Sequence, residues 1–332
     1  MMDTRAVSLV CAALAVLLSA VGTISAQPAE RSLLVSVVDG DGAPVPGLQA
    51  RDFEVREDGV EREVLRAARD TRPRQIALLV DTSEAALGAV ANFRNGVTAF
   101  VNALHRESEI TIISFGGRPR ILVPSTREPA RLREGVAGIF AYSQTAAYLL
   151  DAMSETTLGF VRRGASRPVM VVLATEGLDH SQVDSTTVIR DIEEAGVTVH
   201  AAVLTERSAR TSSRLSFGPI RSGPPGVGLP GFGAPGFDPA GFGAPRDGGF
   251  ARWRIDRDLA LNRAPHAGGG RRRDMLASMA AEATLEAVAA ELLNQYLVVY
   301  SRPATLIPPR DVEVRVARDG VDVRKAPLPE AR

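Results

Sequence analysis

Four oxygen-bearing side chains stand where an apolar run of the sequence ends or where a helix-like segment begins: Asp81, Ser83, Thr145 and Glu176. Hard cations such as Mg²⁺ and Mn²⁺ take carboxylate, hydroxyl and water oxygens as ligands. Asp81 and Glu176 would supply the carboxylates, and Ser83 and Thr145 the hydroxyls. The residue types therefore predict a divalent-cation site, with Mg²⁺ or Mn²⁺ as its cofactor.

The positions of these residues predict that they meet in space. Asp81 and Ser83 come directly after the apolar run 76–80, and Glu176 comes after the run 169–174. In an open α/β sheet, ligands bind beyond the carboxyl ends of the strands, where the strand order reverses. These residues can therefore meet although they are far apart in the sequence, and we expect one site at the top of the sheet.

The elements that would position this site lie in the centre of the chain. Five short, almost wholly apolar runs have the character of parallel strands covered on both faces: 76–80, 110–115, 169–173, 197–204 and 296–300. Between them apolar residues recur every three or four positions, as in Val90, Phe93 and Val97, which indicates helices. The alternation predicts an α/β fold over 75–301: a doubly wound, mostly parallel sheet with helices on both faces.

Both ends of the mature chain have the pattern of β structure. Residues 30–72 contain short alternating strands separated by turns, and residues 306–325 have the alternation and the Asp319-Gly320 turn of a hairpin. Neither segment has enough strands to be stable on its own. We therefore expect the N-terminal β segment and the C-terminal β-hairpin to pack together as one small β unit.

Residues 1–26 have the pattern of a secretory signal peptide. A weakly basic start is followed by the apolar stretch 6–21 and by small residues, with cleavage expected near Ala26. The stretch is short for a membrane span, and a retained anchor is the competing interpretation. Export would place the mature protein in the periplasm or outside the cell. Cys11, the only cysteine, would be removed with the signal, which leaves no thiolate or disulfide chemistry.

Residues 207–273 differ from the rest of the chain in composition. They are rich in Gly, Pro, Ser and Arg, with near-repeats at 231–235 and 241–245. Such a segment buries too little apolar area to offset its ordering entropy, so we expect a disordered insert in the α/β domain. Its twelve arginines and four aspartates give it a net charge of +8 in a chain of formal net charge zero. One interpretation is a solvated spacer, and the other is an arm that contacts an anionic surface.

The central residues also carry a resemblance to a known family. The segments that resemble a von Willebrand factor A (vWA) domain are 76–83, Thr145 before its helix, 175–179 and 291–301. The flanking segments 45–59 and 295–300 resemble those of a subgroup of exported bacterial vWA-related proteins, of acidobacterial type. The resemblance covers nearly all of the mature chain except the insert.

The resemblance implies a metal-ion-dependent adhesion site that binds a protein partner, whose acidic side chain completes the metal shell. Asp81 and Ser83 would be direct ligands and Thr145 a direct or water-bridged one. Glu176 stands where the family has an aspartate, and Ala85 stands where its motif has a second serine. The site is therefore degenerate. Two hypotheses stay open: a functioning metal site, and a vestigial site in a metal-free structural or scaffolding protein of the envelope.

Enzyme interpretations have less support in the sequence. It contains no Gly-x-Ser-x-Gly elbow and no phosphate-binding loop, and no nucleophile, base and orienting group can be assembled from it. A hydrolase with Asp81 and Glu176 as acid and base is the competing class, and it requires both carboxylates in one cleft. Zero net charge argues against nucleic acid as a partner. We therefore expect a non-enzymatic binding protein that contacts a protein or a surface.

Overall fold

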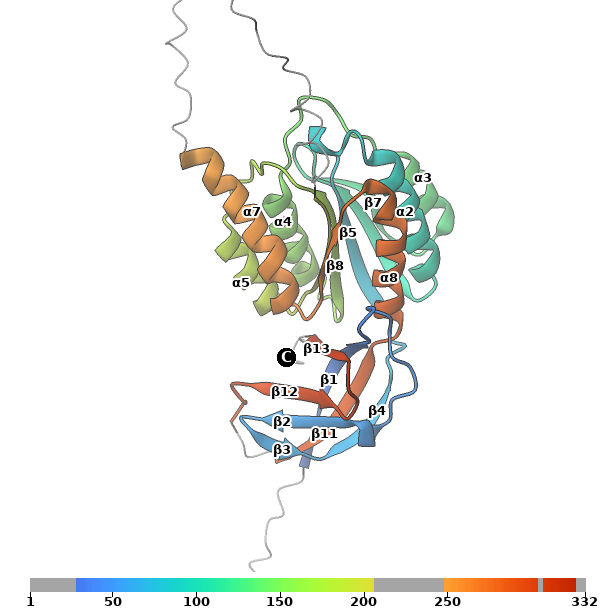
Figure 1. The fold of residues 1–332 in the computed structure, drawn as a ribbon, viewed down its shortest axis with the longest axis vertical. Helices are drawn as coiled ribbons and strands as arrows, with labels where there is room; N and C mark the ends of the chain where they lie inside the picture. The colour runs from blue at the N-terminus through green and yellow to red at the C-terminus, as the bar shows by residue number, and fades with distance from the viewer. Residues whose placement is uncertain (1–27, 206–247, 304–306, 327–332) are drawn as a thin grey trace, which may run out of the picture.

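The computed structural model describes residues 28–205, 248–303 and 307–326. These residues form an α/β domain, drawn above a smaller β module in Figure 1. The predicted signal peptide and residues 207–247 of the predicted insert lie outside the described residues. In the part of the chain that the structure describes, no helix is both long and apolar enough to cross a membrane.

A six-stranded sheet forms the centre of the α/β domain. Its strands, in spatial order, are β10 (Arg272–Met275), β9 (Thr198–Leu204), β8 (Pro168–Thr175), β5 (Arg74–Val80), β6 (Ser108–Ser114) and β7 (Arg120–Thr126). Only β7 is antiparallel to its neighbour. The chain order reverses between β5 and β8, so the carboxyl ends of these two strands flank the switch point of the sheet. The predicted doubly wound α/β fold is confirmed.

Helices cover both faces of this sheet (Figure 1), which explains why every residue of β8 is buried. One face is covered by α2 (Val90–Leu104), α3 (Pro129–Ala137) and α8 (Ala281–Leu293). The other face is covered by α4 (Leu149–Arg162), α5 (Ser185–Ala195) and α7 (Gly248–Ala267). Phe93, Val97 and Phe100 of α2 are buried, as their spacing predicts. Two 3-10 turns, η2 (Glu84–Ala86) and η4 (Ser278–Ala280), lie at the ends of α2 and α8.

The prediction of a disordered insert over 207–273 is wrong for its last part. There α7 packs on β9 through buried Ala260, Leu261 and Ala264, and β10 pairs in parallel with β9. The stretch 250–264 contains neither Gly nor Pro, so it can form a helix with an apolar side. The Gly- and Pro-rich residues before this stretch dominate the composition of 207–273 as a whole, so that composition did not indicate the helix.

The β module consists of two antiparallel sheets. The four-stranded sheet contains, in order, β13 (Asp322–Ala326), β1 (Pro28–Val38), β11 (Tyr296–Pro303) and β4 (Val64–Arg69). The three-stranded sheet contains β12 (Val312–Val316), β2 (Phe53–Glu57), which follows the 3-10 turn η1 (Ala50–Asp52), and β3 (Val60–Arg62). Val35, Val55 and Tyr296 are in the core of this module. The expected packing of the C-terminal segment with the N-terminal one is confirmed, because β13 pairs with β1 and β12 with β2.

Two expectations about this region are wrong. Residues 306–325 do not form a hairpin, because β12 and β13 join different sheets and are linked by a turn in which Gly320 has a φ of +72°. Residues 296–300 do not belong to the parallel sheet either, because β11 pairs antiparallel with β1 and β4, and β10 is the sixth strand of the α/β sheet. An apolar run fits a buried strand of either kind. The α/β domain therefore ends with α8, before residue 301.

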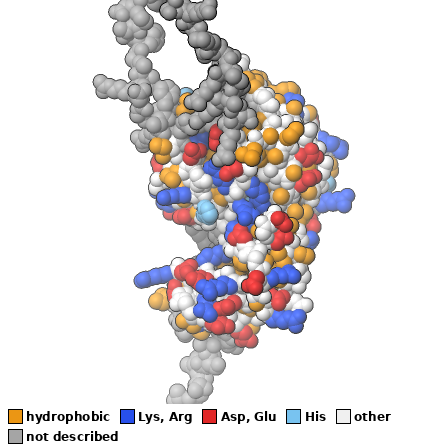
Figure 2. All heavy atoms as spheres, viewed as in Figure 1, with side chains coloured by type: hydrophobic (Ala, Val, Ile, Leu, Met, Phe, Trp, Pro, Cys, Tyr) orange, Lys and Arg blue, Asp and Glu red, His pale blue; other side chains and the backbone are white. Residues whose placement is uncertain are grey.

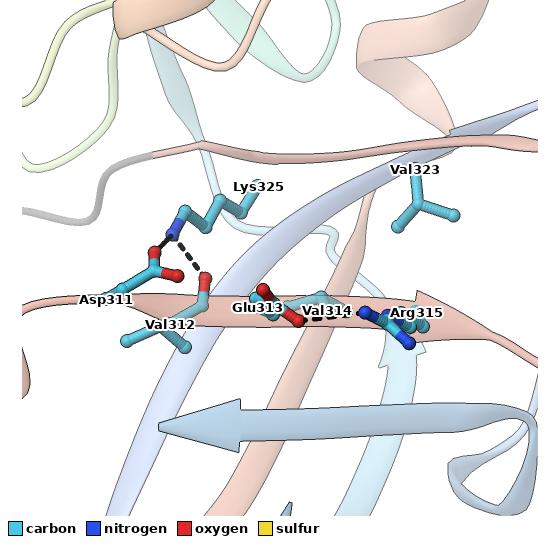
Figure 3. A pocket seen from close by; sticks show the side chains of 7 residues that line it. All are labelled: Asp311, Val312, Glu313, Val314, Arg315, Val323 and Lys325. Atoms are coloured by element: carbon cyan, nitrogen blue, oxygen red, sulfur yellow. Dashed lines mark hydrogen bonds and ion pairs between the residues drawn. The ribbon is translucent and has the colours of Figure 1, made fainter. Parts of the chain in front are cut away.

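The edges of β12 and β13 leave an open groove between the two sheets of the module (Figure 3). Its volume is about 290 Å³, and its lining consists of Asp311, Val312, Glu313, Val314, Arg315, Val323 and Lys325. Lys325 crosses the groove to pair with Asp311 at 3.2 Å and to donate to the carbonyl of Val312. The groove is thus bridged by side chains of its own strands.

A buried carboxylate joins the two modules. Glu291 on α8 is 1 % exposed, and its oxygens lie 2.7 Å from Nη2 of Arg273 on β10 and 2.8 Å from Nη2 of Arg324 on β13. Burial raises the pKa of Glu291, but the charges of His200, Arg324 and Arg273 outweigh burial and lower that pKa to about 2. One side chain thus fixes a helix and an edge strand of the α/β domain to the β module.

Candidate functional site

Asp81 and Thr175 meet at the switch point of the sheet. Asp81 follows β5, Thr175 is the last residue of β8, and the two strands are paired in parallel. Asp81 is 0 % and Thr175 1 % exposed. The site predicted at the carboxyl ends of the strands is therefore buried at its centre.

The carboxylate of Asp81 accepts hydrogen bonds from both strand ends. Its Oδ1 accepts from the N–H of Ser83 at 2.9 Å and from the hydroxyl of Ser83 at 2.6 Å. Its Oδ2 accepts from the N–H of Thr175 at 3.1 Å and from the hydroxyl of Thr175 at 2.7 Å. Asp81 and Ser83 are thus in contact, and the hydroxyl of Ser83 is directed at the carboxylate rather than at the N-terminus of a helix.

A fifth donor to this carboxylate comes from α7. Nη2 of Arg257 lies 3.1 Å from Oδ2 of Asp81 and donates to the carbonyl of Thr175 at 2.6 Å. Nη1 of Arg257 donates to the carbonyl of Leu178 at 3.4 Å. The side chain of Arg257 is only 2 % exposed. Its guanidinium therefore joins the end of β5 to the end of β8 from inside the protein.

Asp81 is ionised in this environment. Burial on its own raises the pKa of Asp81, but the charge of Arg257 and the hydrogen bonds from Ser83 and Thr175 outweigh burial and hold that pKa below its usual value. The stabilisation that Asp81 provides is therefore complete above the pKa of an unfolded aspartate, and it is lost as the pH falls through the lower, folded value.

The loop that carries Thr145 is fixed to the turn after Ser83. The carbonyl of Thr145 accepts from the N–H of Glu84 at 2.9 Å, and Oε2 of Glu84 accepts from the N–H of Gln144 at 2.9 Å. The hydroxyl of Thr145 donates to the carbonyl of Ser143 at 3.3 Å. Thr145 therefore lies beside the site, with its hydroxyl engaged in its own loop.

A glycine allows the loops to approach this closely. A Cβ on Gly116 would lie 2.2 Å from the carbonyl carbon of Thr82, so no other residue fits without a backbone shift. The N–H of Gly116 donates to the hydroxyl of Thr82 at 3.0 Å. The end of β6 is thus held against the Asp81–Ser83 turn.

The two acidic residues after β8 differ in their surroundings. Glu176 is exposed. Asp179 is 2 % exposed, and its carboxylate accepts from the N–H of Leu149 at 2.8 Å and from the N–H of Ser181 at 3.0 Å. The carboxylate of Asp179 therefore caps the N-terminus of α4, where the helix dipole favours a negative charge.

These residues do not fit a divalent cation. Both oxygens of Asp81 are engaged by protein donors, Glu176 is exposed, and Ala85 offers no ligand atom. A divalent ion bound at Asp81 would also meet the like charge of a buried guanidinium. Within the described residues, no group of three or more His, Cys, Asp or Glu side chains is placed to hold a metal ion.

Arg257 is the site residue that the sequence pattern did not indicate. It lies 176 positions after Asp81, inside the segment whose composition predicted disorder. The run Leu259, Ala260 and Leu261, in a stretch without Gly or Pro, was the available signal for a buried helix there. A charged residue one turn from such a run can be buried with the helix, and a buried arginine then requires a carboxylate as its partner.

Comparisons with known proteins concern the fold. No family model matches the sequence, and no curated protein resembles it at the sequence level. Among solved structures, a von Willebrand factor type A protein from Catenulispora acidiphila is 9 % identical with a TM-score of 0.46, over 92 % of this chain and 74 % of its own. BatB from Bacteroides thetaiotaomicron is 14 % identical with a TM-score of 0.42, over 66 % and 98 %. The pilus adhesin SpaC from Lactobacillus rhamnosus GG is 9 % identical with a TM-score of 0.44, over 83 % and 47 %.

The fold is identified by the topology of the chain itself. A doubly wound sheet has the Asp81–Ser83 turn at its switch point, with the Thr145 loop and the turn after β8 beside it. This is the arrangement that the resemblance of these segments implies. The chain therefore has a von Willebrand factor A fold, carried on a two-sheet β module formed by both ends of the described chain.

Proposed function

We propose that the chain is an exported, non-enzymatic binding protein that recognises another protein through the carboxyl-end face of its α/β sheet. The supporting observation is a set of exposed large hydrophobic side chains around that face, here called the apolar rim. Its members and their exposed fractions are Leu87 (45 %), Phe140 (50 %), Tyr142 (56 %), Leu276 (64 %) and Met279 (78 %). Figure 2 shows hydrophobic side chains gathered at the upper end of the α/β domain, on the side of α2 and α8.

Contacts with the site hold the apolar rim in place. The N–H of Tyr142 donates to the carbonyl of Thr82 at 3.2 Å, and the guanidinium of Arg94 lies 4.3 Å from the ring centre of Phe140. Asn92, in the first turn of α2, donates to the hydroxyl of Ser278 at 2.8 Å, next to Met279. The rim therefore surrounds the start of α2 and is ordered before any partner binds, which lowers the entropic cost of association.

The chemistry of this face favours recognition over catalysis. Aromatic residues and Met are enriched at the centres of protein interfaces. Asp81 at the centre of the site is buried and engaged by five donors, which is unfavourable for a role as acid or base toward a substrate. The carboxylates of Glu84 and Glu176 remain exposed. A suitable partner would offer apolar side chains to the apolar rim and a basic group to these two carboxylates. A metal site would instead imply an acidic partner.

Substitutions in the apolar rim are expected to weaken partner binding at least about tenfold without unfolding the chain. Two charges in the centre of the interface must be desolvated against the apolar side chains of the partner. Wild type and the Tyr142→Glu/Met279→Glu variant would each be used to cross-link and identify partners from envelope extract, followed by titration of the purified partner.

The matched control is Val60→Glu/Leu65→Glu, which places two charges at exposed apolar positions of the β module. This control should bind like wild type. Equal partner binding by wild type and by the rim variant would contradict the proposal, and so would loss of binding in the control alone.

A further inference from the structure

Arg257 contacts the carboxylate of Asp81, one of the residues that the resemblance gives as metal ligands. We propose that the guanidinium of Arg257 takes the place of the divalent cation at this site, so that the chain neutralises and assembles the carboxyl-end face with a cation of its own. The inference concerns the folded chain alone. Only one consequence rests on the proposed function: partner binding should be insensitive to chelators.

The contacts of Arg257 are those of a cation among oxygens. It bonds to a carboxylate oxygen of Asp81 at 3.1 Å, to the carbonyl of Thr175 at 2.6 Å and to the carbonyl of Leu178 at 3.4 Å. These oxygens come from the end of β5 and from the turn after β8. Joining the ends of those two strands is the task that a bound metal would perform here.

The charges at the centre of the site are matched without an added ion. The side chains of Asp81 and Arg257 are 0 % and 2 % exposed, and a buried carboxylate requires a close counter-charge or it is strongly destabilising. The second buried carboxylate, Asp179, lies 3.9 Å from Nη1 of Arg257 and accepts a hydrogen bond from the N–H of Leu149 at the N-terminus of α4. One guanidinium and one helix N-terminus thus stabilise two carboxylates.

The helix that supplies Arg257 is part of the domain core. Ala260, Leu261 and Ala264, one to two turns after Arg257, are buried against β9. Nearer the site, the hydroxyl of Ser185 donates to the carboxylate of Asp256 at 3.0 Å, which attaches α7 to the start of α5. Arg257 is therefore positioned by burial of its own helix rather than by the ion pair alone.

The test is the response of thermal unfolding to MnCl₂, measured on the purified chain. Wild type is expected to shift in Tm by less than about 1 °C, because an ion that does not bind the folded state cannot stabilise it. Arg257→Ser removes the guanidinium and opens space beside Asp81. At saturating MnCl₂ its Tm should rise by about 5 °C or more, and Asp81→Asn in the same background should abolish the rise. Arg263→Ser, at an exposed position of α7, should behave like wild type.

Two outcomes would overturn the proposal. A rise in the Tm of wild type that Asp81→Asn removes would show that the ion binds despite Arg257. No response in either wild type or Arg257→Ser would show that Arg257 is not what excludes the ion.

If Arg257→Ser does not fold, the pairing is tested by Asp81→Asn/Arg257→Met. Removal of both charges should give a higher Tm than Arg257→Met alone, because the carboxylate of Asp81 is then no longer buried without its counter-charge. A double variant that melts at or below both single variants would also overturn the proposal.

Discussion

Asp81→Ala is expected to lower the free energy of unfolding by about 3–5 kcal/mol, in EDTA as well as in MgCl₂. The substitution leaves the guanidinium of Arg257 buried without its counter-charge. It also removes the acceptor for the hydroxyls of Ser83 and Thr175, which are themselves buried. Urea unfolding followed by circular dichroism at neutral pH, with and without chelator, measures the effect.

Glu176→Ala is the control for this substitution. Glu176 carries the same kind of charge near the same strand ends but is exposed, so its removal should change the free energy of unfolding by no more than about 0.5 kcal/mol. The account would be contradicted if Asp81→Ala were as stable as wild type in EDTA and less stable than wild type only in MgCl₂. That pattern would mean that Asp81 serves a bound metal rather than Arg257.

Glu291→Ala is expected to have an effect of similar size, also about 3–5 kcal/mol, through a different mechanism. Glu291 is the shared counter-charge of Arg273 and Arg324, whose side chains are each 15 % exposed. Without it, Arg273 loses its counter-charge and Arg324 keeps only that of the more exposed Asp322, whose Oδ2 lies 3.1 Å from its Nε. Urea unfolding gives the loss of stability, and limited proteolysis should show earlier cleavage around β13, because Arg324 loses its attachment to α8.

The pH dependence of stability provides a second measurement on Glu291. Since its folded pKa of about 2 is below its ordinary value of 4.5, its stabilisation is complete above about pH 4.5 and is lost as the pH falls toward 2. Glu291→Gln should flatten that part of the profile. The exposed Glu286→Ala on the same helix is the control and should leave it unchanged. An unaltered acid profile in Glu291→Gln would contradict the assignment.

The parts of the fold that the sequence predicted are those that local pattern determines. Parallel strands buried on both faces must be apolar throughout, so β5 and β8 were recognisable, and the polar residues directly after them had to lie at the carboxyl edge of the sheet. The contact of Asp81 with Ser83 follows from their spacing of two residues in one turn. The position of the candidate site could therefore be predicted without a structure.

The parts that it did not predict depend on contacts between distant residues. The run 296–300 is apolar in the same way as a parallel strand, and only pairing with β1 shows that β11 is antiparallel and belongs to the β module. Asp319-Gly320 predicts a turn correctly, but it does not determine whether the flanking strands pair with each other or with separate sheets. Arg257 stands in a charged stretch where the run Leu259, Ala260 and Leu261 indicates a buried helix but does not indicate which of the nearby arginines is buried.

Crystals of the protein soaked in MnCl₂, with anomalous diffraction recorded at the manganese edge, test the central claim most directly. The account predicts electron density for the guanidinium of Arg257 within hydrogen-bonding distance of Asp81. It also predicts no anomalous peak within coordination distance of Asp81 or Ser83. A manganese peak bound to Asp81 and Ser83, with Arg257 displaced from the carboxylate, would contradict it.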